Sequence, residues 1–288
     1  MKKIAFIGIG LMGLPMAQNL IKKKYQLNVF NRTLKKTEPL KGKATISKSI
    51  GECIKDSEIV ITMLSDDLAI EAVMKNSEFI ENLKSNSTII DMSSIKPKTA
   101  KSFSDFFRKK NINYLDAPVS GGTIGAEDAT LAIMVGGEEN IFNQNKDLLK
   151  CMGNPVLVGP SPSGQIAKLA NQIIVGVTIG AVSEAVTLAE KTGANALKLL
   201  EALKGGWADS KILQTHGKRM IDKDFVARAK NSTHLKDMTN IIEWAKEFNL
   251  ELPISNIIKV MYQNLCDRKL DNKDHSSLYL ELENINKK

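Results

Sequence analysis

The chain has 288 residues, of which 43% are hydrophobic and 25% are charged. These values are ordinary for a folded soluble protein and exclude a wholly disordered, collagen-like or coiled-coil chain. The length is enough for two domains, and for a large core that needs no disulfide or metal to hold it together. The 40 Lys and Arg against 32 Asp and Glu give a net charge of +8.

The basic residues are scattered in short groups rather than gathered in one stretch. The chain has only two Trp, four Tyr and nine Phe, and they do not alternate with the basic groups as a base-stacking surface requires. We therefore interpret most of the lysines as solvated surface and expect no nucleic-acid partner. The largest basic groups are Lys22–Lys24, Lys35–Lys36, Arg108–Lys110 and Lys287–Lys288.

Cysteine usage indicates a reduced environment. Cys53, Cys151 and Cys266 are odd in number and far apart, and no C-x-x-C occurs, so neither a disulfide framework nor a metal site is expected. A cytoplasmic location fits this pattern best. The lysines and apolar run at the N-terminus could suggest a secretory signal, but regularly spaced glycines interrupt the run and no cleavage pattern follows.

The first 160 residues alternate short apolar strands with helical stretches, of which Leu14–Lys24 is the first. Strands that read as continuous apolar runs are typical of a sheet buried on both faces, and their alternation with helices predicts a mostly parallel sheet. We expect a doubly wound α/β domain of the Rossmann type. The predicted strands are Lys3–Gly8, Leu27–Asn31, Ile59–Leu64, Thr88–Met92, Asn113–Asp116, Leu131–Val135 and Pro155–Val158.

The pattern changes at Pro160–Gly164, a Pro/Ser/Gly segment typical of a linker. The helix predicted after it, Gln165–Gly193, is apolar nearly all round in its middle and should be buried on most sides. A membrane span is the alternative, disfavoured by the small polar residues and by the charges of Lys168 and Glu184. Further helices are expected at Ala196–Lys204, Lys211–Ile221, Leu235–Phe248 and Ile254–Leu265.

These patterns predict two domains, residues 1–163 with the parallel sheet and residues 164–288 with helices only. The long helix should lie at the centre of the second domain, because an all-round apolar helix needs partners on several sides. The other helices of that domain, or a second subunit, can supply them.

A G-x-G-x-x-G turn, Gly8 to Gly13, follows the first predicted strand and opens the first predicted helix. In this context Gly8 permits the tight turn, Gly10 lets a pyrophosphate approach the backbone, and Gly13 lets the helix pack on the strand. With Leu11 and Met12, the turn brings N–H groups of the helix start to the phosphates. The alternative is a glycine-rich turn without a ligand.

The second predicted strand ends in Asn31, Arg32 and Thr33, where NAD-binding proteins carry an acidic residue for the ribose hydroxyls. A carboxylate would repel a 2′-phosphate, whereas a guanidinium with Asn and Thr beside it can bind one. We therefore predict NADP rather than NAD, with NAD possible. The alternative is that Arg32 stacks on the adenine of either cofactor.

Six segments resemble one family over nearly the whole chain. The chain is similar to the β-hydroxyacid dehydrogenases, the group that contains 3-hydroxyisobutyrate dehydrogenase. The resemblance implies an NAD(P)-dependent oxidoreductase for small hydroxy acids or semialdehydes, and a homodimer or homotetramer formed through the helical domain. The segments are FIGIGLMGLPMAQNL (Phe6–Leu20), DMSSIKP (Asp91–Pro97), DAPVSGG (Asp116–Gly122), GQIAKLANQ (Gly164–Gln172), HLKDM (His234–Met238) and DHSSL (Asp274–Leu278).

Lys168 stands at the position of the catalytic lysine of this family. In reduction it would give a proton to the carbonyl oxygen, and in oxidation it would accept one. Such a lysine is expected to have a pKa lowered toward the working pH by burial or by neighbouring positive charge. A surface lysine near a helix start is the alternative, but the apolar neighbours would make an idle charge costly.

The resemblance also assigns the remaining site residues. Ser120, Gly121 and Gly122 match the loop that binds the substrate carboxylate, which a hydroxyl and backbone N–H groups can do. Asn171 and Gln172, three and four residues after the lysine, would orient the substrate and the ammonium. Cofactor contacts are implied for Leu64, Ser65, Ser94 and Lys236, whereas Asp274 and His275 are expected to pack near the site without a chemical step.

The pair Asn171–Gln172 differs from the Asn-Asn of many members and resembles the tartronate semialdehyde reductase branch. This favours reduction of tartronate semialdehyde, with glyoxylate and succinic semialdehyde as related substrates. The alternatives are a 3-hydroxyisobutyrate dehydrogenase working in the oxidative direction and a non-catalytic NADP-binding scaffold. An imine reductase is disfavoured because that branch usually lacks the lysine.

Overall fold

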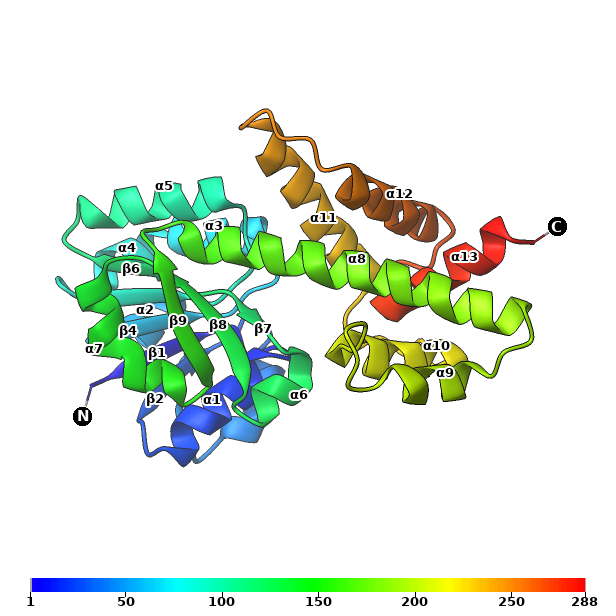
Figure 1. The fold of residues 1–288 in the computed structure, drawn as a ribbon. Coiled ribbons are helices and arrows are strands. Elements are labelled where there is room, and N and C mark those ends of the chain that lie inside the picture. The colour runs from blue at the N-terminus through cyan, green and yellow to red at the C-terminus, as the bar shows by residue number, and fades with distance from the viewer. Residues whose placement is uncertain (1, 288) are drawn as a thin grey trace. The chain divides into compact units, whose positions relative to one another are not determined.

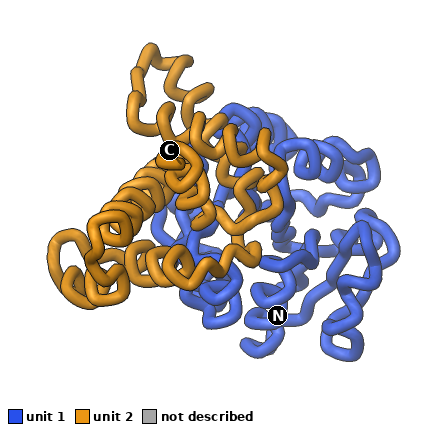
Figure 2. The backbone as a smooth tube through the Cα atoms, turned by 90° about the vertical axis from the view of Figure 1, so that its right-hand side faces the viewer, with its two compact units in different colours: residues 1–168 blue, residues 169–288 orange. Residues whose placement is uncertain are grey.

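The computed structural model describes residues 2–287 and divides the chain into two compact units, residues 1–168 and 169–288 (Figure 2). The division falls within helix α8 (Ser163–Lys191), after Lys168. The first turn of this helix is hydrogen-bonded to the first unit, as described below, and its remaining turns belong to the second.

The first unit contains a mostly parallel sheet, as the alternating pattern predicted (Figure 1). Within the described residues nine strands form one sheet in the order β3-β2-β1-β4-β5-β6-β8-β7, with β9 on β8, and β8 antiparallel to both β6 and β7. The strands β3 and β7, of two residues each, were not expected from the sequence. The strands are β1 (Ile4–Ile7), β2 (Leu27–Phe30), β3 (Thr45–Ile46), β4 (Ile59–Thr62), β5 (Thr88–Asp91), β6 (Asn113–Asp116), β7 (Val119–Ser120), β8 (Leu131–Gly136) and β9 (Gly153–Gly159).

Helices cover both faces of this sheet, which explains why its strands are continuously apolar. In β1, Ile4 and Phe6 point into one hydrophobic core while Ala5 and Ile7 point into the other. The first core is completed by α1 (Gly13–Lys22), the 3₁₀ helix η1 (Leu34–Leu40), α6 (Gly122–Glu127) and α7 (Glu139–Lys150). The second is completed by α2 (Ile50–Ile54), α3 (Asp67–Met74), α4 (Ser77–Asn82) and α5 (Pro97–Arg108).

The second unit is helical, and no strand follows β9 in the part of the chain that the structure describes. The expected helix at Lys211–Ile221 contains a π-helical turn, and a C-terminal helix is present that the sequence patterns did not predict. The elements are the later turns of α8, α9 (Ala196–Leu203), the π-helical η2 (Leu213–Gly217), α10 (Lys218–Ile221), α11 (Asn231–Lys246), α12 (Pro253–Asp267), the 3₁₀ helix η3 (His275–Leu278) and α13 (Tyr279–Ile285).

Helix α8 is long and apolar enough to cross a membrane by length and composition, with a mean hydropathy of 1.6 in its most apolar window. A core helix passes the same test, and Ile179, Val182 and Val186 on α8 belong to the hydrophobic core of the second unit. Two glycines allow close packing there. A Cβ on Gly176 would lie 2.6 Å from Nε2 of His234 on α11, and a Cβ on Gly180 would lie 2.6 Å from Cδ1 of Ile258 on α12.

All three histidines of the chain gather in the second unit. The Nε2 atoms of His216 and His275 are 2.8 Å apart, so one ring donates a hydrogen bond to the other, and the ring of His234 is centred 5.5 Å from that of His275. Burial lowers the pKa of His216, and the neighbouring His275 lowers it further. Burial and the neighbouring His234 likewise lower the pKa of His275.

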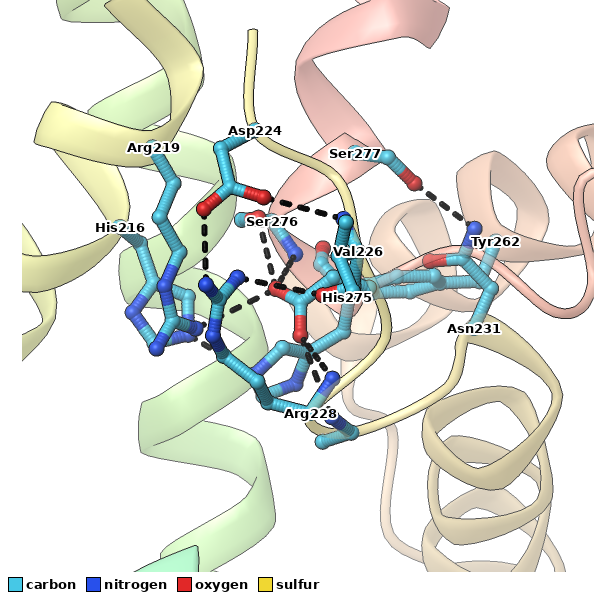
Figure 3. Close-up of polar contacts among 12 residues, drawn as sticks. His216, Arg219, Asp224, Val226, Arg228, Asn231, Tyr262, His275, Ser276 and Ser277 are labelled. Carbon is cyan, nitrogen blue, oxygen red and sulfur yellow. Dashed lines mark hydrogen bonds and ion pairs between the residues drawn. The ribbon is translucent and has the colours of Figure 1, made fainter. Parts of the chain in front are cut away.

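The buried carboxylate of Asp274 organises the loop next to this pair. Figure 3 shows the polar contacts of this region, with His216, Arg219, Arg228, His275 and Ser276 labelled. It accepts hydrogen bonds from the Ser276 hydroxyl, from the backbone N–H groups of Arg228 and Ala229, and from the guanidinium of Arg219. Ligand atoms of His216, Asp274 and His275 lie within 4.8 Å of one another, a spacing that could suit a metal ion. Because the carboxylate is already hydrogen-bonded and a guanidinium adjoins it, the cluster suits structural polar packing better.

The histidine pair makes the stability of the second unit depend on pH. The unfolded histidines bind protons below about pH 6.5 whereas the folded ones resist protonation, so their contribution to stability is complete above that pH and declines as the pH falls. Each unit of pKa difference is worth about 1.4 kcal/mol.

We expect the melting temperature to fall between pH 7.5 and 5, and to fall less steeply for His216→Gln. Calorimetry of both proteins across this range measures the difference in slope, and carboxyl contributions cancel because both proteins share them. Equal slopes would show that the pair does not resist protonation.

Candidate active site

The glycine turn between β1 and α1 has the geometry that its sequence predicted. Gly8 has a φ of +103°, and a Cβ there would overlap the carbonyl oxygen of Met63. A Cβ on Gly13 would overlap the carbonyl oxygen of Gly8. At Gly10, by contrast, no atom lies within 4 Å of the place that a Cβ would occupy. Two glycines are thus required by the turn itself, and the third leaves the backbone open to a ligand.

Asn31 connects the glycine turn to the end of β2. Its Oδ1 accepts a hydrogen bond from the N–H of Ile9 at 3.0 Å, and its Nδ2 donates to the carbonyl of Thr33 at 2.9 Å. The side chain therefore braces the turn, a role that the sequence patterns did not reveal. Arg32 and Thr33, which follow it, are exposed.

The parallel register brings several predicted site residues to one edge of the sheet. Ile7 pairs with Thr62, Thr62 with Asp91, and Asp91 with Asp116, so the loops after β1, β4, β5 and β6 emerge side by side. Ligands of open α/β sheets bind at this carboxyl edge. The loops carry the glycine turn, Leu64 and Ser65, and Ser94. The chain that leaves β6 continues into β7, which ends at Ser120 and is followed by Gly121 and Gly122.

Two of these loops are joined directly. The N–H of Leu64, after β4, donates a 2.9 Å hydrogen bond to the hydroxyl of Ser93, after β5. Ser65 donates to the carboxylate of Asp66 at 2.7 Å. The expected cofactor residues Leu64 and Ser94 therefore lie on connected segments of the backbone.

Two buried carboxyl groups, Asp91 and Asp116, end the central strands β5 and β6. Burial raises the pKa of each to about 6, although hydrogen bonds to the carboxylates oppose the shift. Asp91 accepts from the hydroxyls of Thr62 and Tyr114 and from the N–H of Ser93. Neither was assigned a role from the sequence. The sequence feature that could have identified them is a charged residue at or near the end of a predicted strand.

Lys168, in the first turns of α8, lies beside the predicted carboxylate loop. Its Nζ donates a 3.0 Å hydrogen bond to the carbonyl of Val119, the residue before Ser120. In that loop Gly121 and Gly122 have φ values of +143° and +64°, which residues with a Cβ rarely adopt. The structure therefore brings together Lys168 and the segment Ser120–Gly122.

The other predicted residues form a polar chain in the second unit. Nδ2 of Asn171 donates to Oε1 of Gln172 at 2.7 Å, and Nε2 of Gln172 donates to Oδ2 of Asp237 at 2.6 Å. Oδ1 of Asp237 lies 3.1 Å from Nζ of Lys236. Asp237 is buried and connects the residues of α8 to Lys236 on α11, a role that sequence reasoning missed although it lies within the HLKDM motif.

On helix α8 itself, Lys168, Asn171 and Gln172 are spaced at i, i+3 and i+4 and so share one face. Within the first unit, the Lys168 ammonium beside the Ser120–Gly122 segment has the chemistry to bind a carboxylate and deliver a proton.

Comparisons with known proteins identify the family of the chain. Residues 3–159 match the family model for the NAD binding domain of 6-phosphogluconate dehydrogenase. Residues 162–282 match that for the NAD-binding domain of NADP-dependent 3-hydroxyisobutyrate dehydrogenase. The 2-hydroxy-3-oxopropionate reductase of Escherichia coli (strain K12) is 40% identical over 284 residues, which cover 98% of this chain and 97% of that protein.

Two further relatives belong to the same group. The mitochondrial 3-hydroxyisobutyrate dehydrogenase of Drosophila melanogaster is 34% identical over 96% of this chain and 88% of that protein. The solved structure of Mycobacterium tuberculosis 3-hydroxyisobutyrate dehydrogenase with L-serine has a TM-score of 0.89 and 25% identity, over 98% of this chain and 99% of that one. The chain therefore belongs to the NAD(P)-dependent β-hydroxyacid dehydrogenases, the family that its six motifs predicted.

Proposed function

We propose that the protein reduces tartronate semialdehyde (2-hydroxy-3-oxopropanoate) with NADPH, and that Lys168 is the general acid. The observation that carries this proposal is the contact of Lys168 with Val119, which holds the ammonium next to the segment Ser120–Gly122, the proposed binding site of the carboxylate. The 40% identity to an Escherichia coli enzyme named for this substrate supports the choice of aldehyde. Glyoxylate and succinic semialdehyde, which also pair a carbonyl with a carboxylate, are related candidates.

The residues at the carboxyl edge fit a dinucleotide. The open space at Gly10 admits a pyrophosphate, and the exposed guanidinium of Arg32 can bind a 2′-phosphate where no carboxylate repels it. Leu64, Ser65, Ser94 and Lys236 would hold the rest of the cofactor. When bound, NADPH supplies the hydride.

The chain itself binds the substrate and moves the proton. The Ser120 hydroxyl and the backbone N–H groups of the glycines bind the carboxylate. Lys168 Nζ donates a proton to the oxygen that gains negative charge, and the resulting neutral amine takes a proton from water. Asn171 and Gln172 orient the hydroxy acid, and Asp237 fixes the Gln172 carboxamide by accepting its N–H.

Gln172 favours the tartronate semialdehyde assignment over the 3-hydroxyisobutyrate alternative. Its side chain is one methylene longer than Asn and both ends of its amide are engaged, so it presents a fixed polar surface that suits a hydroxyl-bearing substrate. An aldehyde panel that includes methylmalonate semialdehyde distinguishes the two. The retained lysine argues against a non-catalytic scaffold.

We also propose a homodimer or homotetramer formed through the second unit. Large apolar side chains are exposed on it, among them Ile174 and Leu188 on α8 and Ile257 on α12. Exposed apolar side chains that gather into a patch commonly mark an interface, and we propose that these residues contribute to one.

Replacing the proton donor should abolish most of the turnover. We expect Lys168→Ala to lower kcat by about 10²- to 10⁴-fold, because general acid catalysis contributes that much. The dissociation constant of NADPH should change by less than about threefold, because the proposed role of the ammonium is in proton transfer. NADPH oxidation and fluorescence titration measure the two quantities.

Lys191→Ala provides the control, since it removes an exposed lysine at the far end of the same helix. The control should keep wild-type turnover. Undiminished turnover in Lys168→Ala would rule out the proposed general acid.

Removing the guanidinium should act on one cofactor selectively. We expect Arg32→Ala to weaken NADPH binding by about 10- to 100-fold, the range for a lost hydrogen bond to a charged group, and to leave NADH binding nearly unchanged. Titration of each cofactor with the wild type, with Arg32→Ala and with Lys55→Ala, which removes an exposed charge elsewhere, measures the effect. Equal weakening of both cofactors would refute a 2′-phosphate contact.

A further inference from the structure

We propose that Gln165 is a positioning residue, whose buried side chain ties the loop Ser93–Ile95 to the turn of α8 that carries Lys168. The proposal rests on the role proposed above for Lys168. It concerns residues of the first unit only, and it assigns a function to a side chain that would not itself touch the substrate or the cofactor.

The Gln165 carboxamide is fully buried, with 0% of its surface exposed. Nε2 donates a 2.8 Å hydrogen bond to the carbonyl of Ser93, and Oε1 accepts a 3.1 Å hydrogen bond from the N–H of Ile95. Both ends of the amide are thus engaged by one loop, which is about 70 residues away in the sequence. This two-point contact fixes the position of the loop and also its orientation.

The backbone of Gln165 is fixed as well. Its N–H donates a 2.9 Å hydrogen bond to Oδ2 of Asp116, the buried carboxyl group at the end of β6. A Cβ on Gly164 would lie 2.8 Å from the same oxygen and would overlap the Asp116 carbonyl oxygen, so only glycine permits this approach. A carboxylate at a helix N-terminus is favoured by the exposed N–H groups and by the helix dipole.

One helical turn separates Gln165 from Lys168, whose Nζ contacts the Val119 carbonyl. The first turns of α8 therefore hold both loops on which the proposed chemistry depends. Gln165 holds the segment that carries Ser94, an expected cofactor contact, and Lys168 borders the segment that carries Ser120. The distance between the proton donor and the cofactor loop is consequently set by the Gln165 side chain.

Loss of the amide would leave the Ser93 carbonyl and the Ile95 N–H without their partner. The loop would then relax toward other hydrogen bonds, and Lys168 would lose its fixed distance from Ser94. A misplacement of about 1 Å can cost about 100-fold in rate. Because Ser94 is the only proposed binding group on the relaxed loop, while the other groups for substrate and cofactor stay in place, turnover should suffer more than affinity.

Three variants test the proposal in the full-length protein with NADPH and tartronate semialdehyde. Gln165→Met keeps the length of the side chain without its hydrogen bonds, and Gln165→Asn keeps the amide but withdraws it by about 1.5 Å. Asn145→Leu is the matched control, because it deletes another buried amide of the same unit, one that donates to Ile141 within α7.

We expect both Gln165 variants to lower kcat by about 10- to 100-fold while KM for either reactant changes by less than about threefold. Asn145→Leu should keep wild-type kcat even where it lowers the melting temperature equally. Unchanged kcat in both Gln165 variants overturns the proposal. So does a joint loss of kcat and affinity that merely follows the melting temperature, as it would for a structural role.

Hydrogen exchange of the cofactor-free protein gives a readout that does not depend on the substrate assignment. The Ile95 amide should exchange at least tenfold faster in Gln165→Met than in the wild type, and at the wild-type rate in Asn145→Leu. Equal exchange in the wild type and Gln165→Met overturns the proposal. If the wild type reduces none of the aldehydes, the proposed function fails, and this exchange experiment still decides whether Gln165 fixes the loop.

Discussion

Burial of the first unit's parallel sheet on both faces is the constraint on which the candidate site depends. Ile4 and Phe6 face one core while Ala5 and Ile7 face the other, so the strand interiors can accommodate few polar groups. The polar chemistry is therefore concentrated at the strand ends. Because β1, β4, β5 and β6 run parallel in register, their carboxyl ends emerge together and bring the glycine turn, Leu64 and Ser94 to one edge.

The start of α8 lies at the same edge, where the carboxyl group of Asp116 accepts a hydrogen bond from the N–H of Gln165. Asp116 is buried, with a pKa raised by that burial, and the backbone N–H groups at the start of a helix are favourable partners for its carboxylate. Three of the basic residues that make up the +8 net charge have proposed anionic partners, namely Lys168, Lys236 and Arg32. The other basic residues are mostly exposed, and several form surface ion pairs of little energetic weight. Arg219 and Arg268 differ, because they pair with the buried carboxylates of Asp274 and Glu281.

Much of the fold could be predicted from the sequence, because the patterns that indicate these strands and helices lie within short stretches of the chain. Seven strands, the glycine turn and the long helix could be predicted from apolar runs and glycine spacing, and the family motifs identified Lys168. Strands β3 and β7 could not, because two residues carry no periodicity and pair only when their neighbours are in place. The roles of Asn31, Asp116, Gln165 and Asp237 were also hidden. Their hydrogen bonds join segments 22 to 72 residues apart, which no local pattern encodes.

The central claim is that the first turns of α8 fix a lysine that delivers the proton. A crystal structure of the complex with NADP⁺ and the hydroxy acid product tests it most directly. We predict that Lys168 Nζ lies within hydrogen-bond distance of the product hydroxyl while Gln165 keeps its hydrogen bonds to Ser93 and Ile95. A hydroxyl contacted by some other proton donor, with Lys168 still bound to the Val119 carbonyl, would contradict the account.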